Sequence, residues 1–174
     1  TLEKSVVIEG NQSYFYNTPL LLVPRMEGHE VTNPIMSSKL FVVLPVARSI
    51  QMPEKKKEGV TVDPLFTSTE LSWTKTDPES KNLQKEEGDK KGPFVLGVAI
   101  TKEYGKTAAD YTRIIAIGTS QFIAASDIAS LSGNLDLIMN SVNWVRNQQD
   151  NIIIRPKSLI PEQLNFQNRT QVLL

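Results

Sequence analysis

The sequence predicts an α/β fold with a mostly parallel or mixed sheet. Segments typical of strands and of helices are interspersed along the 174 residues, and this arrangement favours the α/β class. Several of the strand-like segments are continuous apolar runs, as expected for strands that are buried on both faces. A composition of 40% hydrophobic and 22% charged residues is that of an ordinary globular protein, and we expect residues 1–174 to form a single domain.

Six strands are predicted from short runs of aliphatic and β-branched residues that are bounded by turn signals. They cover residues 5–9, 19–24, 39–47, 60–69, 94–101 and 113–118. One more short strand is expected in the segment NIIIRPKSLIPEQLNFQNRTQVLL, before its two prolines. Pro19 lacks an amide hydrogen, so it fits best at a strand start or at a sheet edge. The run 39–47 is almost entirely apolar and is predicted to be a strand buried on both faces. Residues 102–112 are expected to form a hairpin-like or loop connection.

The strongest helix prediction covers residues 134–149, and a short helical turn is expected at residues 33–38. The apolar residues of the longer helix follow the i, i+3, i+4, i+7 spacing, which predicts that they form one face. These residues are Leu135, Ile138, Met139, Val142 and Val145. Asn134 is expected to cap this helix, and Asp136 in the first turn suits the helix dipole. Asn33 is the expected cap of the shorter turn.

Two further segments are predicted to be irregular. Residues 72–93 are polar, charged and nearly free of aliphatic side chains, so we expect a long exposed loop with some mobility. The tail at residues 156–174 contains two prolines and shows only weak helical periodicity.

The charge balance and the residue usage exclude several classes of function. Lysine plus arginine number 19, as do aspartate plus glutamate, so there is no electrostatic case for a nucleic acid or an anionic membrane surface as a partner. The absence of cysteine excludes thiolate catalysis, disulfides and cysteine-ligated metals. His29 is the only histidine, which argues against a transition-metal site and favours a loop histidine bonded to the backbone. We predict no metal and no cofactor.

The stretch RIIAIGTSQFIAASD at residues 113–127 poses the main functional question, because an apolar strand there ends in small polar residues. A catalytic nucleophile elbow has the pattern G-x-S-x-G, whereas this stretch has Phe122 in place of the second glycine. A serine hydrolase with Ser120 as nucleophile and His29 as base is therefore only a minor alternative. The chain contains no glycine-rich phosphate-binding motif.

We favour a structural role for this turn. Gly118 is expected to end the strand, and Thr119 or Ser120 to bond the free amide groups of the next turn. The carboxyl ends of strands in α/β sheets also form binding crevices. Thr119, Ser120 and Gln121 are therefore candidates for ligand binding.

Several segments, taken together and in order, resemble a known family. HEVTNPIMSSKLFVVLPVARSI resembles a His-and-Pro segment that precedes a strand ending in LPxARS, and VDPLFTSTELSWTKTD resembles PLLxTSxxSW. KGPFVLGVAIT resembles GPxxLAVA. RIIAIGTSQFIAASD followed by SGNLDLIMNSVNWV resembles RxVVxGDSDFxSN followed by GNxDLxLNxxNWL. This order is similar to that in the extracytoplasmic auxiliary subunits of uncharacterised bacterial ABC transporters, a group that includes the gliding-motility protein GldG.

The resemblance implies a flavodoxin-like or glutamine-amidotransferase-like three-layer fold, of which this chain would be an incomplete part. It implies a non-catalytic auxiliary role in an ABC-type transport system, on the extracytoplasmic side of a bacterial membrane. The transporter's permease and ATPase subunits would be its partners. A membrane helix is expected to follow the tail, and the amino-terminal half of the family's domain is expected to be missing.

The resemblance also bears on individual residues. Gly118 matches the family's turn, but Thr119 and Gln121 stand where the family has acids, which argues against a metal or acid–base role there. The matches to the family's helix motif are assigned capping and packing roles. They are Gly133, Asn134, Asp136, Asn140, Asn143 and Trp144.

A carbohydrate-binding module is the other alternative. Trp73 and Trp144 could each stack on a sugar, which would make a glycan the ligand, although tryptophans in such places are more often part of a core edge. Trp73 lies beside the polar segment 72–93, and Trp144 lies off the main apolar stripe of its helix.

Overall fold

The computed structural model of the chain describes residues 1–10, 18–55, 57–75, 82–105, 111–124 and 133–146. Within these residues, nine strands and two helices form, and all strand pairs are antiparallel. The elements are β1 (Leu2–Ile8), β2 (Leu21–Leu22), β3 (Arg25–Met26), α1 (Asn33–Ser37), β4 (Leu44–Pro45), β5 (Arg48–Ile50), β6 (Val60–Thr67), β7 (Trp73–Lys75), β8 (Val95–Glu103), β9 (Tyr111–Ile117) and α3 (Asn134–Val145). The fold is β-rich. The predicted α/β fold with a mostly parallel or mixed sheet, flavodoxin-like or amidotransferase-like, is wrong.

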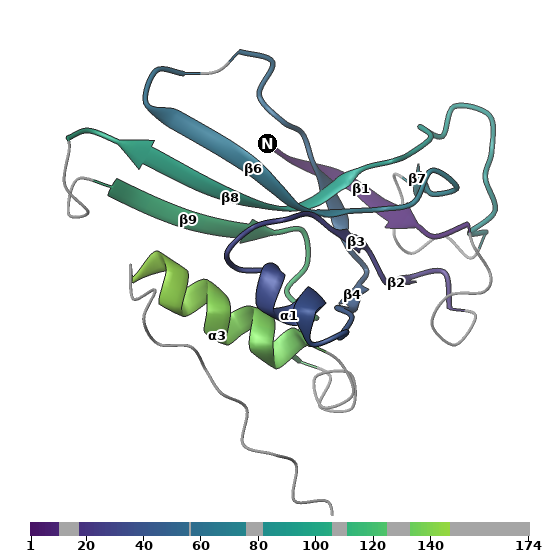
Figure 1. The fold of residues 1–174 in the computed structure, drawn as a ribbon. Coiled ribbons are helices and arrows are strands. Elements are labelled where there is room, and N and C mark those ends of the chain that lie inside the picture. Colours follow the sequence, from purple (N-terminus) through teal and green to yellow (C-terminus); the bar gives the residue numbers. More distant parts are fainter. Residues whose placement is uncertain (11–17, 56, 76–81, 106–110, 125–132, 147–174) are drawn as a thin grey trace, which may run out of the picture.

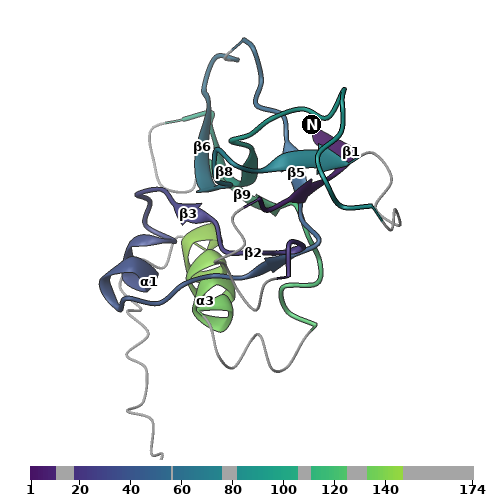
Figure 2. The same cartoon turned by 90° about the vertical axis from the view of Figure 1, so that its right-hand side faces the viewer.

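The largest sheet has the strand order β3-β6-β8-β9. Strands β8 and β9 are consecutive and antiparallel, as expected from the hairpin-like connection predicted between them. In the middle of the sheet, Ile100 faces Val62 on one neighbouring strand and Ile114 on the other. Figure 1 shows both helices on the same side of this sheet, and Figure 2 shows α3 beside α1 in the turned view.

The error in the predicted sheet type has a physical cause that β8 illustrates. Val98 and Ala99 are consecutive, so their side chains point to opposite faces of the sheet, yet each is only 1% exposed. Ala99 belongs to the main core cluster, and β5 packs against β8. A continuous apolar run therefore indicates that both faces are covered, which is correct here, but it does not determine the direction of the neighbouring strands.

The remaining strands form two smaller sheets, with the orders β5-β1-β7 and β2-β4. In the run 39–47, predicted as one strand, only β4 is a strand. The predicted burial is confirmed for Val42, Val43, Leu44 and Ala47, which are fully buried, but not for Phe41, which is 37% exposed. Instead of extending a strand, the backbone of Val43 pairs with the side-chain amide of Asn134.

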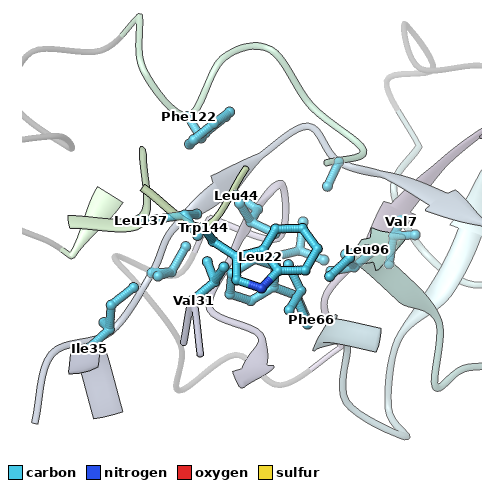
Figure 3. Packing of buried hydrophobic residues seen from close by; sticks show 14 residues of the cluster. Val7, Leu22, Val31, Ile35, Leu44, Phe66, Leu96, Phe122, Leu137 and Trp144 are labelled. Carbon is cyan, nitrogen blue, oxygen red and sulfur yellow. The ribbon is translucent and has the colours of Figure 1, made fainter. Parts of the chain in front are cut away.

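The core lies between the large sheet and the helices. Leu137 and Trp144 of α3 belong to one buried cluster with Leu22, Val31 and Phe66, which come from separate segments of the chain (Figure 3). The helix is thus held by a small number of large side chains that enter the core from one of its sides.

The face of α3 that packs on the core is not the predicted one. Of the five apolar residues expected to share the buried face, only Ile138 packs against the core cluster. The other four are exposed: Leu135 by 52%, Met139 by 49%, Val142 by 46% and Val145 by 44%. The buried residues of α3 are Asn134, Leu137 and Trp144. Because this stripe starts with a polar residue, hydrophobic periodicity did not reveal it.

The segment 72–93, predicted as an exposed loop, is ordered in its described parts. It begins with β7, which pairs with β1. The Lys75 side chain is 6% exposed, and its ammonium group lies 2.7 Å from a carboxylate oxygen of Glu86 and 2.8 Å from one of Asp89. The Glu86 backbone amide also donates to Asp89. A buried lysine therefore holds Glu86 and Asp89 of this segment through ion pairs, which composition alone did not indicate.

The helix starts also differ from the predictions. Gly133 is the N-cap of α3, and Thr32 is the N-cap of α1, in both cases without a side-chain capping hydrogen bond. Asn134 and Asn33 are instead the first helical residues. The predicted helical residues 147–149, the short strand expected before the two prolines and the tail at 156–174 lie outside the described residues.

Candidate functional site

Gly118 connects the end of β9 to two other strands. Its amide donates to the carbonyl of Leu96 at 2.8 Å, and its carbonyl accepts from the amide of Arg48 at 2.9 Å. A Cβ atom at this position would clash with the carbonyl oxygen of Arg48. The backbone of β5 thus comes too close to β9 for any other residue, and Gly118 has the scaffolding role expected of it.

Thr119 closes the turn that follows. Its hydroxyl donates to the carbonyl of Pro45 at 2.6 Å and accepts from the amide of Gln121 at 3.1 Å. Of the two hydroxyl residues considered for this role, Thr119 performs it, whereas Ser120 is exposed. The turn is therefore fixed to the end of β4.

The three residues predicted as ligand-binding candidates lie together at one pocket of about 480 Å³. We call it the β9-end pocket. It is lined by Leu2, Val6, Val46, Arg48, Ile117, Gly118, Thr119, Ser120 and Gln121. Its residues come from β1, from the segment of β4 and β5, and from β9 with its turn.

Two residues at the β9-end pocket were missed by the sequence reasoning. Arg48 is the only charged residue among the described ones that line it, and it stands in the segment LPVARS, which matches the LPxARS motif. Val46 adopts a φ of 48°, a left-handed conformation that is unfavourable for a β-branched residue. The motif could have pointed to Arg48, but no sequence signal predicts a left-handed valine.

Trp73, the fourth predicted ligand-binding residue, does not lie at this pocket. It is in β7, where its indole nitrogen donates to the carbonyl of Leu83 at 3.1 Å. The ring packs so closely on Gly10 that a Cβ there would lie 2.6 Å from it. The structure uses this ring to hold neighbouring backbone segments.

His29, Trp144 and Arg113 form a separate cluster at the C-terminal end of α3. The rings of His29 and Trp144 meet edge to face, with centroids 5.0 Å apart. The Arg113 guanidinium lies 5.2 Å from the Trp144 ring and donates to the Trp144 carbonyl at 2.9 Å. Trp144 is 7% exposed, so it offers no free face to a sugar.

The electrostatic environment of His29 favours a neutral imidazole. Burial lowers its pKa, and although Asp63 and Glu30 act to raise it, the net pKa stays below the ordinary value. Its Nδ1 accepts a hydrogen bond from the amide of Val31 at 3.1 Å, so that nitrogen carries no proton. His29 is thus a loop histidine bonded to the backbone, as the sequence analysis favoured.

The structure does not bring Ser120 and His29 together. The carbonyl of Phe122, two residues beyond Ser120, bonds the first residue of α3. His29 contacts Trp144, next to the last residue of that helix. A helix of 12 residues is about 18 Å long. The two residues of the proposed hydrolase pair therefore lie near opposite ends of α3.

Several of the residues that match the family's helix motif hold α3 in place. The buried amide of Asn134 makes three hydrogen bonds: it accepts from Val43 N–H at 2.9 Å and donates at 2.8 Å to the carbonyls of Val43 and Phe122. Asn140 donates to the carbonyl of Val31 at 3.1 Å. A Cβ at Gly133 would lie 2.7 Å from Ile35. These are packing roles, although Asn134 is not the cap that was expected.

A second and larger cavity, of about 670 Å³, contains none of the predicted site residues. Its floor includes the apolar side chains of Val60, Val62, Val98 and Ile100, from one face of the large sheet. Lys55, Lys57 and Glu54 also line it. The mixed charge of these residues gives no clear preference for the charge of a ligand.

The comparisons with known proteins add no family assignment. No model of a known protein family, no curated protein and no solved structure matches this chain. Among the described residues, no group of three histidine or acidic side chains could hold a metal ion. Neither α1 nor α3, the helices of the described ranges, is long and apolar enough to cross a membrane.

Proposed function

We propose that this chain is a non-catalytic interaction domain of the extracytoplasmic auxiliary component of a bacterial ABC-type transport system, anchored to the membrane outside the described residues. The ordered sequence motifs support this proposal. The antiparallel sheets differ from the fold that the resemblance implies, so the fold does not support it. The proposal is supported by the internal contacts of the motif residues and by an apolar surface that remains exposed.

The observation that carries the proposal is that the motif residues make contacts inside the protein. Thr119 bonds Pro45, Asn134 bonds Val43 and Phe122, and Trp144 is buried in the core. Catalytic groups must touch a substrate, whereas these groups hold segments of the chain against one another. The residues that match the family motifs therefore stabilise the fold, and any recognition of a partner takes place on the protein's surface.

The surface best suited to a protein partner is the α3 apolar face, formed by Leu135, Met139, Val142 and Val145. Each of these side chains is 44% exposed or more, and their spacing aligns them along one side of the helix. Phe41 and Ile123 are also exposed, in segments that hydrogen-bond to the start of α3. Exposed apolar residues gathered in this way mark interaction sites.

The proposed occupant of the α3 apolar face is an apolar surface of the transporter's permease subunit. An amphipathic helix that presents apolar residues at i, i+4 and i+7 fits a hydrophobic groove. The permease is the partner that the motif order implies, and a membrane-anchored domain would be held beside it. Burial of these side chains would then drive association.

Site-directed photo-crosslinking in cells that also produce the permease and ATPase subunits tests this function. A photoreactive residue in place of Met139 should yield a covalent product with the permease subunit. The same residue in place of Lys102, which is exposed in β8, is the matched control and should not. If both positions give the same products, or if the Met139 position captures no transporter subunit, the proposal is wrong.

A charged substitution provides a second test. Met139→Asp should reduce recovery of the permease with the tagged chain by about tenfold or more, because a carboxylate would be buried in an apolar contact. Thr61→Asp, at an exposed position in β6, should leave recovery unchanged. Both variants should keep the unfolding temperature of the parent chain, since neither side chain is part of the core cluster.

A further inference from the structure

We propose that the β9-end pocket binds a small organic carboxylate, with Arg48 as the group that pairs with the anion. The juxtaposition that supports this is that Arg48, Ser120 and Gln121, whose side chains carry a guanidinium, a hydroxyl and an amide, line the same pocket. The inference is independent of the permease contact proposed for α3. It assigns a ligand class to residues that the sequence analysis left as unspecified binding candidates.

The charge of the pocket selects an anion. Within the part of the chain that the structure describes, Arg48 is the only charged residue that lines it, and no carboxylate does. Among the described residues, the Arg48 guanidinium forms no ion pair or hydrogen bond. By contrast, Arg25 pairs with Glu27, and Arg113 bonds the Trp144 carbonyl. An arginine without an internal acceptor keeps its planar set of donors for an external carboxylate.

Hydrogen bonds hold together the two backbone segments that carry the polar residues of the pocket. The amide of Arg48 donates to the Gly118 carbonyl at 2.9 Å, and the Thr119 hydroxyl donates to the Pro45 carbonyl at 2.6 Å. These two bonds fasten the segment that carries Arg48 to the turn that carries Ser120 and Gln121. The ligand would therefore meet two segments whose backbones are already fixed relative to each other, which reduces the entropy cost of binding.

The conformation of Val46 is an independent observation at the same place. Its left-handed φ of 48° is strained for a β-branched residue, and such strain concentrates at functional sites. Its amide donates to the Leu20 carbonyl at 2.8 Å, which helps to hold this conformation. The reversal at Val46 places Ala47 in the core and Arg48 at the pocket.

The apolar walls favour a carboxylate with a short hydrocarbon chain over inorganic phosphate. Leu2, Val6, Val46 and Ile117 line the pocket beside the polar groups. One guanidinium balances a monoanion, whereas a phosphate dianion would need further positive charge. The volume of about 480 Å³ lies within the range of about 300–1,000 Å³ typical of small-molecule sites.

The test is an NMR titration of the chain with sodium butyrate, at constant ionic strength set with sodium chloride. Butyrate up to about 10 mM saturates a site with a Kd of about 1 mM. It should shift the amide signals of Arg48, Ser120 and Gln121 along a saturable curve. Butyramide, a neutral molecule of the same shape, should produce no such shift. If butyrate gives no saturable shift at these residues, the proposal fails.

Substitutions identify the pairing group. Arg48→Met should weaken butyrate binding by about tenfold or more, and Arg48→Lys should weaken it less, because lysine keeps the charge but not the two parallel donors. Arg146→Met, at an exposed arginine just after α3, is the matched control and should bind as the parent does. Unchanged shifts of core residues such as Leu96 would confirm that Arg48→Met folds, and unchanged butyrate affinity in this variant would overturn the proposal.

Inorganic phosphate separates the carboxylate from other anions. We expect phosphate at the same concentration and ionic strength to bind at least about tenfold more weakly than butyrate, because it gains nothing from the apolar walls. Acetate should fall between the two, since its shorter chain buries less apolar surface. Equal affinity for phosphate and butyrate would contradict the assignment of the ligand class.

Discussion

Single residues join parts of this chain that lie far apart in the sequence. Gly118 lets the backbone of β5 approach β9, because any Cβ there would clash with Arg48. Trp144 fills the core from α3 and also contacts His29 and Arg113. Such positions tolerate little change in size, since the neighbouring atoms are backbone or buried side chains.

Replacing Gly118 with alanine should destabilise the chain. The added Cβ would force apart two backbone segments that hydrogen-bond to each other, so we expect Gly118→Ala to lower the free energy of unfolding by at least about 2 kcal/mol. Gly28→Ala is the matched control, because a Cβ there would make only an ordinary contact, 3.7 Å from Asn33. Urea denaturation of both variants measures the difference, and equal stability would contradict the close approach described here.

The lone histidine should make stability depend on pH near neutrality. Because burial holds the pKa of folded His29 below its ordinary value, the unfolded chain takes up a proton at higher pH than the folded chain does. Stability should therefore fall as the pH drops below about 6.5, the ordinary histidine pKa, and level off below the folded pKa.

An NMR titration of the His29 ring protons measures the folded pKa directly. Urea denaturation between pH 7.5 and 5.5 should show a loss of stability in the parent chain and a smaller loss in His29→Gln. A ring pKa above the ordinary value would mean that Asp63 and Glu30 outweigh burial, and the stability trend would then reverse.

At the scale of elements, α3 is held as much by an amide as by hydrophobic contacts. Its first residue, Asn134, is fully buried and makes three hydrogen bonds to the backbone of two other segments. Its outer side carries the α3 apolar face, which makes no contribution to the core cluster among the described residues. The helix is therefore positioned by Asn134 at its start, by Leu137 and Asn140, and by Trp144 near its end.

Removing the Asn134 amide should destabilise the fold more than its size suggests. Asn134→Ala would leave buried backbone groups of Val43 and Phe122 without partners, at a cost of about 2–4 kcal/mol in the free energy of unfolding. Asn33→Ala, at an exposed position in α1, should change stability by no more than about 0.5 kcal/mol. Urea denaturation provides the comparison, and a loss of under about 1 kcal/mol for Asn134→Ala would contradict the role assigned to it.

The stability contributed by the ion pair between Lys75 and Asp89 should depend on pH. Burial acts to lower the pKa of Lys75, but its hydrogen bonds to Asp89 and Glu86 outweigh this and raise it, and the bond to Lys75 lowers the pKa of Asp89. The stabilisation from Asp89 is present above its unfolded pKa of about 3.9 and is lost as the pH falls through the lower folded value. That from Lys75 is lost above about pH 10.4, as the pH rises through its folded pKa.

Acid denaturation of Asp89→Asn tests this. The variant should be less stable than the parent at pH 7, and the difference should shrink as the pH falls to 3. Glu87→Gln, at an exposed carboxylate in the same segment, should follow the parent throughout. A difference between Asp89→Asn and the parent that stays constant with pH would show that the carboxylate is not charged in its pair with Lys75.

At the scale of the whole molecule, the sequence predicted what is buried better than how the strands run. The apolar runs at 94–101 and 113–118 correspond to β8 and β9, and the run at 39–47 is largely buried, as expected. The sheet type was wrong because apolar runs do not encode strand direction. The predicted buried face of α3 was wrong because the stripe that is buried begins with a polar residue, Asn134. The ligand-binding candidates 119–121 lie at one pocket, but the left-handed Val46 depends on contacts distant in sequence.

Backbone NMR can check the sheet type. In antiparallel sheets, the α protons of every second facing pair lie close together. We therefore expect a strong nuclear Overhauser effect between the α protons of either Ile100 and Ile114 or the adjacent pair, Ala99 and Ile115. Between β6 and β8, the same should hold for Val62 and Ile100 or for Asp63 and Ala99. Absence of all four effects would contradict the antiparallel sheet.

The long sequence separation between Asn134 and Val43, 91 residues, has a kinetic consequence. A contact that closes so large a loop loses much chain entropy before it gains any stabilisation, so it forms late in folding. Refolding of Asn134→Ala should then proceed at nearly the parent rate, while its unfolding should be faster. The N-terminal end of α3 would therefore pack last during folding and detach first during unfolding.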